Sequence, residues 1–295
     1  MWPAVMVSGP MILRDAHCLP KAAFAEATRW PLDRESCLQL TRGVRAAPPV
    51  SWPVLTLHAV WFGSALLCFD DRRVRIDEGD YFCVNAGRAV RFEGLGGASV
   101  RMLTLAFRRG LAEAVAGSRT PVIQSEHIVT QDRSVASALN YICRNVEHGF
   151  ANQHWYEEQY QFVLERVIAR QHARLELLDR LDTPRRSSRL EALRRIDRAR
   201  DFMLSNFELP LTLREIAQQA FLSPFHFARL FRQIEGVTTY EFLQRRRASC
   251  ALELLTSTRL PLEEVARRAG FNSRITLFRV CKQFFERSPS ALRAA

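Results

Sequence analysis

The chain has 295 residues, of which 47% are apolar, so it can form two folded domains with buried cores and is not globally disordered. Its net charge of +11 is unevenly distributed. Residues 1–183 contain 21 basic and 20 acidic side chains, whereas residues 184–295 contain 21 basic and 11 acidic ones. Charge alone also fits a role in solubility, but only the C-terminal part is suited to bind a polyanion.

Cysteine spacing and hydropathy argue against several classes of protein. The seven cysteines are scattered, and none forms the close pair typical of a zinc knuckle or a redox site. This scatter favours free thiols in a reducing, cytoplasmic environment. No run approaches the roughly 18 apolar residues of a membrane span. Met1–Leu13 is apolar but lacks a basic start, so we interpret it as a flexible arm or a misassigned start, not a signal peptide.

Residues 36–107 contain short runs rich in β-branched and aromatic side chains, separated by glycine and aspartate. The expected strands are Cys37–Leu40, Val54–Phe62, Ala65–Phe69, Arg72–Ile76, Tyr81–Val84, Ala89–Phe92 and Val100–Phe107. Many short strands at close spacing predict a β-sandwich or barrel, which we place at 30–110 within an N-terminal domain of residues 1–183.

Helical periodicity follows in residues 132–182, with expected helices at Arg133–Glu147 and Gln153–Leu181. The second helix has an apolar stripe and a charged opposite face, which leaves two interpretations open. It either covers its own barrel or pairs with its copy in a homodimer. A polar stretch with Pro184 then predicts a linker at 184–190.

The C-terminal domain, residues 191–295, begins a pattern that occurs twice. Thr212 and Glu215 have the spacing of a capping box, and Ser223 followed by Pro224 starts the next helix. That helix has one apolar face and ends at Gly236. Its apolar face consists of Phe227, Leu230, Phe231 and Ile234. One anchored face and one polar face are typical of a recognition helix.

About fifty residues later the pattern returns. Glu264-Val265-Ala266 matches Glu215-Ile216-Ala217, and Ser273 starts a helix with the same apolar spacing. Its apolar face consists of Leu277, Val280, Cys281 and Phe284. This internal repeat predicts two helix-turn-helix units, at about 212–234 and 261–285. A connecting helix at Thr239–Thr256, about 25 Å long, could hold the two recognition helices ~34 Å apart, one turn of DNA.

Residues 190–295 resemble the DNA-binding domain of the AraC/XylS family of transcription regulators. The matching residues are Leu213–Ala217, Ser223–Phe231 with Gly236, Arg247 with Leu254-Leu255, Ala266 with Gly270–Ser273, and Ser288-Pro289 to Arg293. The resemblance covers the whole domain and implies a sequence-specific DNA-binding transcription regulator, more often an activator, that also contacts RNA polymerase.

The resemblance also implies which residues contact bases: Pro224, Phe225, Ala228, Arg229, Arg274, Ile275, Thr276 and Arg279. The chemistry agrees in part, because arginine pairs with guanine, and Ala228, Ile275 and the Thr276 methyl suit thymine. For Phe225 the alternative is packing within the protein. The expected phosphate contacts are Ser223, Arg232, Arg245, Arg246, Arg247, Ser273 and Lys282.

Three positions of the second unit depart from the family pattern. Glu286 replaces a glycine, Cys281 replaces a phenylalanine, and Pro261 occupies the capping position that Thr212 holds in the first unit. We therefore expect the second unit to be less well packed and the first to read its bases more stringently. Phe278 is an outward aromatic residue whose role the sequence leaves open.

The segment Ile76–Tyr81 and the strand pattern resemble the cupin-like barrel that often precedes this DNA-binding domain. The expected fold class is therefore α+β: a cupin-like β-barrel with following helices, then an all-α double helix-turn-helix domain. The resemblance implies a small-molecule effector and dimerisation. The histidines are isolated, and no nucleophile elbow or phosphate loop occurs, so we expect no metal, no cofactor and no enzymatic activity.

Two interpretations of function remain. The first is an effector-responsive activator in the cytoplasm. The second is a ligand-independent regulator whose barrel only dimerises or binds a protein partner. Arginines of the expected strands could in part line a pocket for an anionic effector, although we favour solvent-facing positions for them. These arginines are Arg72, Arg73, Arg75, Arg88, Arg91 and Arg101.

Overall fold

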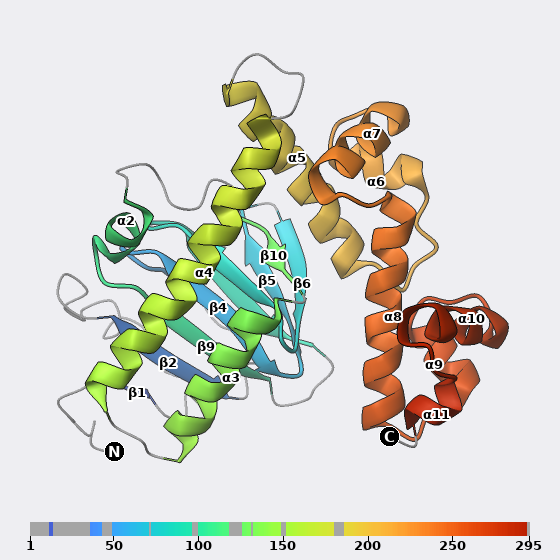
Figure 1. The fold of residues 1–295 in the computed structure, drawn as a ribbon, viewed down its shortest axis with the longest axis horizontal. Helices are drawn as coiled ribbons and strands as arrows, with labels where there is room; N and C mark the ends of the chain where they lie inside the picture. The colour runs from blue at the N-terminus through green and yellow to red at the C-terminus, as the bar shows by residue number, and fades with distance from the viewer. Residues whose placement is uncertain are drawn as a thin grey trace. The chain divides into compact units, whose positions relative to one another are not determined.

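The structure is a computed structural model in which the chain divides into two compact units, Met1–Glu176 and Leu177–Ala295 (Figure 1). It describes residues 12–13, 36–42, 49–70, 72–95, 100–117, 126–130, 132–148, 152–179 and 186–293. The boundary between the units falls inside a helix, whereas the sequence placed it at residue 183.

The described strands of the first unit form two sheets. The six-stranded sheet has the order β1-β2-β9-β4-β7-β10, and the four-stranded sheet has the order β3-β8-β5-β6. The strands are β1 (Ile12–Leu13), β2 (Cys37–Arg42), β3 (Val50–Ser51), β4 (Thr56–Phe62), β5 (Ser64–Phe69), β6 (Arg72–Asp77), β7 (Tyr81–Val84), β8 (Ala89–Gly94), β9 (Arg101–Ala106) and β10 (Ile128–Val129). All paired strands are antiparallel except β1 and β2.

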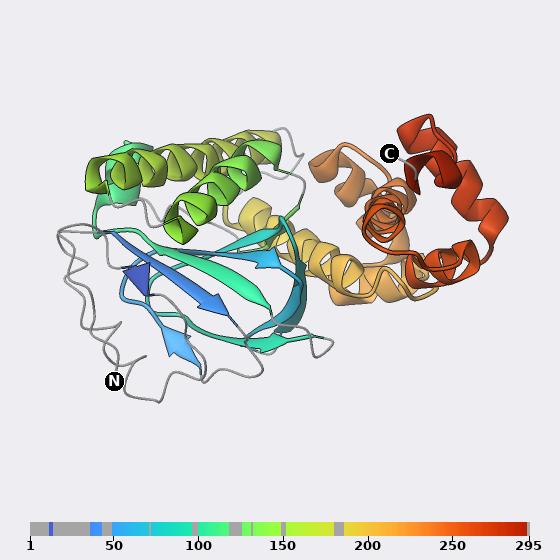
Figure 2. The ribbon, with the colours of Figure 1, turned by 90° about the horizontal axis from the view of Figure 1, so that it is seen from below.

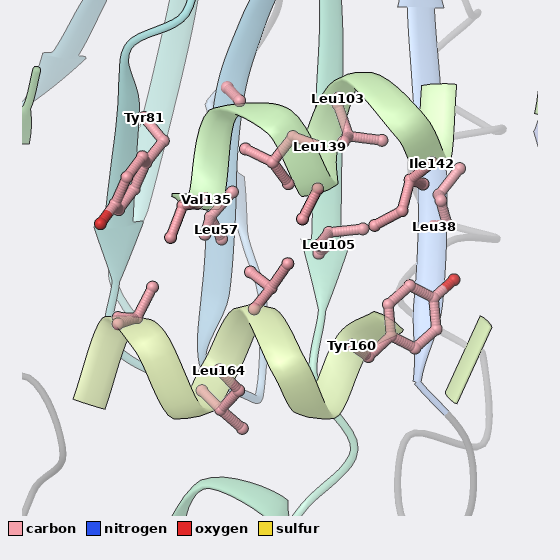
Figure 3. Close-up of a cluster of buried hydrophobic side chains, with 14 of the residues drawn as sticks. Leu38, Leu57, Tyr81, Leu103, Leu105, Val135, Leu139, Ile142, Tyr160 and Leu164 are labelled. Carbon is pink, nitrogen blue, oxygen red and sulfur yellow. The ribbon is translucent and has the colours of Figure 1, made fainter. Parts of the chain in front are cut away.

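The six-stranded sheet is the middle layer of the first unit (Figure 2). One face packs against α3 (Arg133–Glu147) and α4 (Gln153–Asp179), while a short helix α2 (Leu111–Ala116) follows β9. Figure 3 shows this core, in which leucines of alternate strand positions meet Val135, Leu139 and Ile142 of α3 and Tyr160 and Leu164 of α4. The period-2 alternation of each strand places the intervening side chains on the other face. There Phe82 contacts Phe69 of the four-stranded sheet, with ring centroids 5.0 Å apart.

The seven expected strands are present with small differences at their ends. The sequence missed β1, β3 and β10 because two-residue strands show no periodicity, and it missed the short helix α2. Instead of one barrel, the described strands form two hydrogen-bonded sheets, because β5 pairs with β6 and β8 and not with a strand of the larger sheet. Ile12–Leu13, expected to belong to an arm, pairs with β2.

The described part of the second unit is helical. Its helices are α5 (Arg186–Ser205), α6 (Leu213–Gln219), α7 (Pro224–Glu235), α8 (Thr239–Ser257), α9 (Leu262–Arg268), α10 (Arg274–Phe285) and α11 (Pro289–Arg293). Residues 186–190 of the expected linker belong to α5, which begins at Arg186. The apolar spacing of Leu190, Leu193 and Ile196 accounts for Leu190 being part of this helix. Residues 184–185 lie outside the described residues. No helix in the described ranges is long and apolar enough to cross a membrane.

Candidate nucleic-acid interface

The first helix-turn-helix unit consists of α6 and α7. The Thr212 hydroxyl accepts a hydrogen bond from the Glu215 amide at 3.2 Å, and the Thr212 amide donates to the Glu215 carboxylate at 2.8 Å. This confirms the expected capping box. The Thr212 amide and hydroxyl both donate to the Glu215 carboxylate, and these two hydrogen bonds lower its pKa. The Ser223 hydroxyl caps α7, and Gly236 ends it in the left-handed conformation with φ 73°.

The recognition helix α7 has the two faces that its sequence predicted. Phe227, Leu230, Phe231 and Ile234 are buried. On the opposite side Arg229 and Arg232 are exposed, and neither forms an ion pair with another described residue. Phe225 is 83% exposed, which rules out packing within this unit as the reason for an aromatic residue there. An exposed aromatic side chain on a polar helix face is available to a partner.

The second helix-turn-helix unit, α9 and α10, repeats this arrangement, but its helix ends are less well capped. Pro261 gives α9 no side-chain cap, whereas Ser273 caps α10 through the Thr276 amide at 3.2 Å. Glu286 ends α10 with φ 57°, a left-handed conformation that disfavours residues other than glycine. Cys281 is buried in the core, and burial raises the pKa of its thiol to about 11.

The outward face of α10 matches that of α7 at its most exposed positions. Ile275, at the position equivalent to Phe225, is 80% exposed, and Arg279 is exposed like Arg229. The Arg274 guanidinium donates to the Glu263 carboxylate of α9 at 3.1 Å. Thr276 and Phe278 are half-buried, as is Ala228 of α7. The structure thus brings the residues expected to contact bases onto one face of each recognition helix.

The residues expected to contact phosphates divide into two groups. Arg232 and Lys282 are exposed without an ion pair among the described residues, Ser223 and Ser273 lie at helix N-termini, and Arg245 pairs with Glu241 at 2.6 Å. Arg246 and Arg247, in contrast, point into the domain. The Arg246 guanidinium lies 4.8 Å from the Phe207 ring centroid, and Arg247 donates to the Phe207 and Leu209 carbonyls, each at 2.7 Å. The arginine trio is therefore not one phosphate-binding surface.

The sequence reasoning missed a buried charged cluster that positions the recognition helix of the first unit. Asp197, Arg200 and Asp201 of α5 are buried, and the Arg200 guanidinium lies 3.5 Å from the carboxylate of Glu235, the last residue of α7. Their spacing is helical and overlaps the apolar stripe of Ile196 and Ala199. Charged residues in register with a buried stripe were the signal available for this cluster.

A second polar site lies between the sheets of the first unit. Gln39, Thr104 and His58 occupy paired positions on β2, β9 and β4. The His58 ring contacts Phe92 of the smaller sheet, with centroids 4.9 Å apart, and its nitrogens lie 3.0 Å from the Thr56 and Thr104 hydroxyls. Burial lowers the pKa of His58 to about 3, so the ring is neutral. The side-chain nitrogen of Gln39 is buried and has no hydrogen-bond partner among the described residues.

The arginines on the strands occupy mixed positions. Arg72, Arg75, Arg88, Arg91 and Arg101 are half-buried and Arg73 is exposed. Arg75 bonds to Asp77 at 2.8 Å, Arg88 pairs with Glu126 at 3.1 Å, and Arg91 pairs with Glu93 at 2.8 Å. Their carboxylate partners favour a surface role over an anion pocket.

Comparison with known proteins agrees with this geometry. Residues 216–295 match the family model of a helix-turn-helix domain. The chain is 37% identical over 90 residues to the arabinose operon regulatory protein of Escherichia coli, which covers 30% of each protein. It is 28% identical over 93 residues to the multiple antibiotic resistance protein MarA of the same organism, which covers 32% of this chain and 73% of that protein.

A solved structure, the C-terminal domain of the response regulator AraT from Geobacillus stearothermophilus, is 31% identical. It covers 34% of this chain and 84% of that one, with a TM-score of 0.33. The fold and the repeated units define the C-terminal part as a double helix-turn-helix domain. Together with the curated matches, they identify it as a domain of the AraC/XylS family. The similarity spans about a third of the arabinose regulator, and so concerns this domain and not the whole chain.

Proposed function

We propose that the chain is a sequence-specific DNA-binding transcription regulator, cytoplasmic and not an enzyme, that reads two half-sites with α7 and α10. One observation carries this proposal: both recognition helices present, at equivalent positions, an arginine without an ion pair among the described residues and a highly exposed apolar residue. These are Arg229 with Phe225 and Arg279 with Ile275. Arginine can form two hydrogen bonds with guanine, and an apolar side chain can contact the thymine methyl group.

Selection from a random duplex library tests this proposal with the full chain. The expected result is a bipartite site whose half-sites are separated by about one helical turn. Arg229→Ala and Arg279→Ala should each relax the preference at one base pair, in different half-sites. Retention of random duplexes alone, with no enriched sequence, would reject sequence-specific recognition.

We further propose that the first unit binds a small-molecule effector through the polar row of Gln39, Thr104 and His58. The side-chain nitrogen of Gln39, which has no partner among the described residues, supports this site, because a buried polar group without a hydrogen bond is costly until a ligand supplies one. A cupin-like arrangement of the two sheets on either side of this row belongs to the same proposal. Activation of transcription through RNA polymerase is its downstream consequence.

A thermal-shift screen of the full chain against metabolites, aromatic acids and fatty acids tests the effector proposal. A ligand at 100 times its Kd stabilises its unit by about 2.7 kcal/mol. Gln39→Leu should abolish that shift while leaving DNA binding unchanged. A shift that persists in Gln39→Leu would place the ligand elsewhere.

The second candidate is a ligand-independent regulator whose first unit only dimerises or binds a protein. Exposed aromatic residues on the helical layer favour it: Tyr141 of α3 is 54% exposed and Phe162 of α4 is 36% exposed. Sedimentation of Tyr141→Ser and Phe162→Ser distinguishes the two candidates. Conversion of a dimer to a monomer supports pairing of these helices between two copies.

A further inference from the structure

Two segments far apart in sequence meet beside the middle of α8. The first is Phe207–Leu209, the loop that follows α5 in the first half of the DNA-binding domain. The second is Gly270, in the turn between α9 and α10 of the second half. Gly270 has φ 78°, and a Cβ atom added there would lie 2.5 Å from the Phe207 carbonyl oxygen and 2.9 Å from the Glu208 Cα. The two backbones are therefore in direct contact, and only glycine fits between them.

Arg247 of α8 joins the same contact. Its Nε and one terminal nitrogen donate to the Phe207 and Leu209 carbonyls, each at 2.7 Å. The Nε also lies 2.9 Å from the position a Gly270 Cβ would occupy. Burial lowers the pKa of Arg247 from its usual high value, which leaves the guanidinium charged at neutral pH. A charged, forked donor fixes two carbonyls at once and holds the loop against the turn.

The first helix-turn-helix unit, α6 and α7, contains a different residue at the equivalent turn position. Phe221 follows the end of α6 as Gly270 follows the end of α9, and it too has a positive φ, 54°. Phe221 is 70% exposed, whereas Gly270 is buried. A turn of this kind therefore does not itself require glycine. The glycine at 270 is explained by the close approach of Phe207 and Arg247, which the first unit lacks at its turn.

We infer that Arg247 and Gly270 form a lock that fixes the second helix-turn-helix unit relative to the first, and thereby sets the spacing of half-sites that the domain accepts. The inference rests on the proposed function. The connecting helix α8 packs against both helix-turn-helix units: its Phe242 ring contacts Phe231 of α7, and its Ala251 and Leu255 lie in the core of the second unit. This packing is the first attachment between the units. The contact of Phe207–Leu209 with Gly270 is a second attachment away from the α8 backbone, and two attachments restrict rotation. Arg247 is thus a positioning residue that touches no base.

The test compares spacing profiles of the full chain on duplexes derived from its selected site. Inserting or deleting one base pair between the half-sites rotates one against the other by about 35°. The wild-type chain should lose at least about 10-fold in affinity on either change. Arg247→Ala should lose less than about 3-fold, while its affinity for a duplex carrying one half-site stays within about 2-fold of wild type.

Arg259→Ala is the matched control, because it removes the same charge from an exposed position just after α8. It should keep the wild-type spacing profile. Arg247→Lys keeps the charge but cannot donate to both carbonyls as a fork, so its spacing penalty should lie between those of wild type and Arg247→Ala. This variant also preserves the comparison if Arg247→Ala does not fold.

Two results would overturn the inference. One is a wild-type spacing penalty in folded Arg247→Ala or in Arg247→Lys. The other is a wild-type chain that binds all spacings equally. Failure of the wild-type chain to select any sequence is a separate outcome, which rejects the proposed function and not the lock alone.

Discussion

Exchange of two residues at the ends of the recognition helices isolates the effect of backbone conformation. Gly236 and Glu286 occupy the same position after α7 and α10, both with positive φ, and each amide donates to a carbonyl four residues earlier, at 3.0 and 3.1 Å. Nothing lies within 4 Å of a Cβ added at Gly236, so Gly236→Glu introduces no clash. The paired substitutions Gly236→Glu and Glu286→Gly therefore differ chiefly in their backbone energies.

The expected magnitude follows from three contributions. A left-handed conformation costs a residue other than glycine about 1–2 kcal/mol. A glycine at this position offsets about 0.4–1 kcal/mol of that difference, because it gives the unfolded chain more conformational freedom and so destabilises the folded state. A carboxylate at a helix C-terminus adds a few tenths of a kcal/mol of repulsion. Glu286→Gly should therefore stabilise the domain by about 1 kcal/mol, and Gly236→Glu should destabilise it by a similar amount.

Differential scanning calorimetry of the full chain measures both changes. For a unit of this size, 1 kcal/mol corresponds to about 4 °C in Tm. The two substitutions should shift the Tm of the C-terminal unit, Leu177–Ala295, by similar amounts in opposite directions. If Glu286→Gly lowers the Tm, the Glu286 side chain stabilises the domain by an interaction that outweighs its backbone strain, and the reasoning fails.

Three further predictions concern DNA affinity, specificity and pH. Arg229→Ala should weaken binding to the selected site by about 1–3 kcal/mol and relax the preference at one base pair, whereas Arg232→Ala should weaken binding to all duplexes alike and flatten its salt dependence. Binding titrations at several salt concentrations separate the two effects. An equal loss of affinity for random DNA in Arg229→Ala would count against base reading by Arg229. The helices of the first helix-turn-helix unit have the better caps, so base substitutions in its half-site should lower the affinity more than substitutions in the half-site of the second. Equal losses of affinity in a binding assay would contradict this. His58 has a folded pKa of about 3 against an unfolded value near 6.5, so the unfolded state binds the extra proton between these pH values and the free energy of unfolding should fall as pH decreases through that window. His58→Gln should flatten this dependence in pH-dependent unfolding, and the exposed control His154→Gln should not.

The local pattern predicted the DNA-binding domain well because each of its signals is short-range. The capping box of Thr212 and Glu215, the glycine after α7 and the apolar faces of α7 and α10 all involve residues within about one or two turns of helix. Such contacts form wherever the segment is helical, so they can be read without knowing the fold. Once the buried apolar positions of each recognition helix are known, the remaining positions are its exposed face.

Other features could not be predicted, because they depend on segments that meet only after folding. Arg246 and Arg247 look like solvent-facing charges in sequence, yet the Phe207–Leu209 loop captures them from about 40 positions away. The alternation along the strands was evident, but the division into two sheets depends on which strands pair, and β8 pairs with β5 across some twenty residues. Strand pairing of this kind is set by tertiary packing and not by the composition of one strand.

The sequence by itself determined a neutral mixed unit, a basic helical unit with a duplicated helix-turn-helix pattern, and the faces of its recognition helices, since periodicity and capping are local. Only the tertiary structure decided that the Phe225 side chain is exposed and that Gln39 and His58 share one buried row. It also decided that the distant loop at Phe207 packs directly against Gly270. These features arise from contacts between residues distant in the chain, and a backbone carbonyl that accepts such a contact leaves no mark in the sequence.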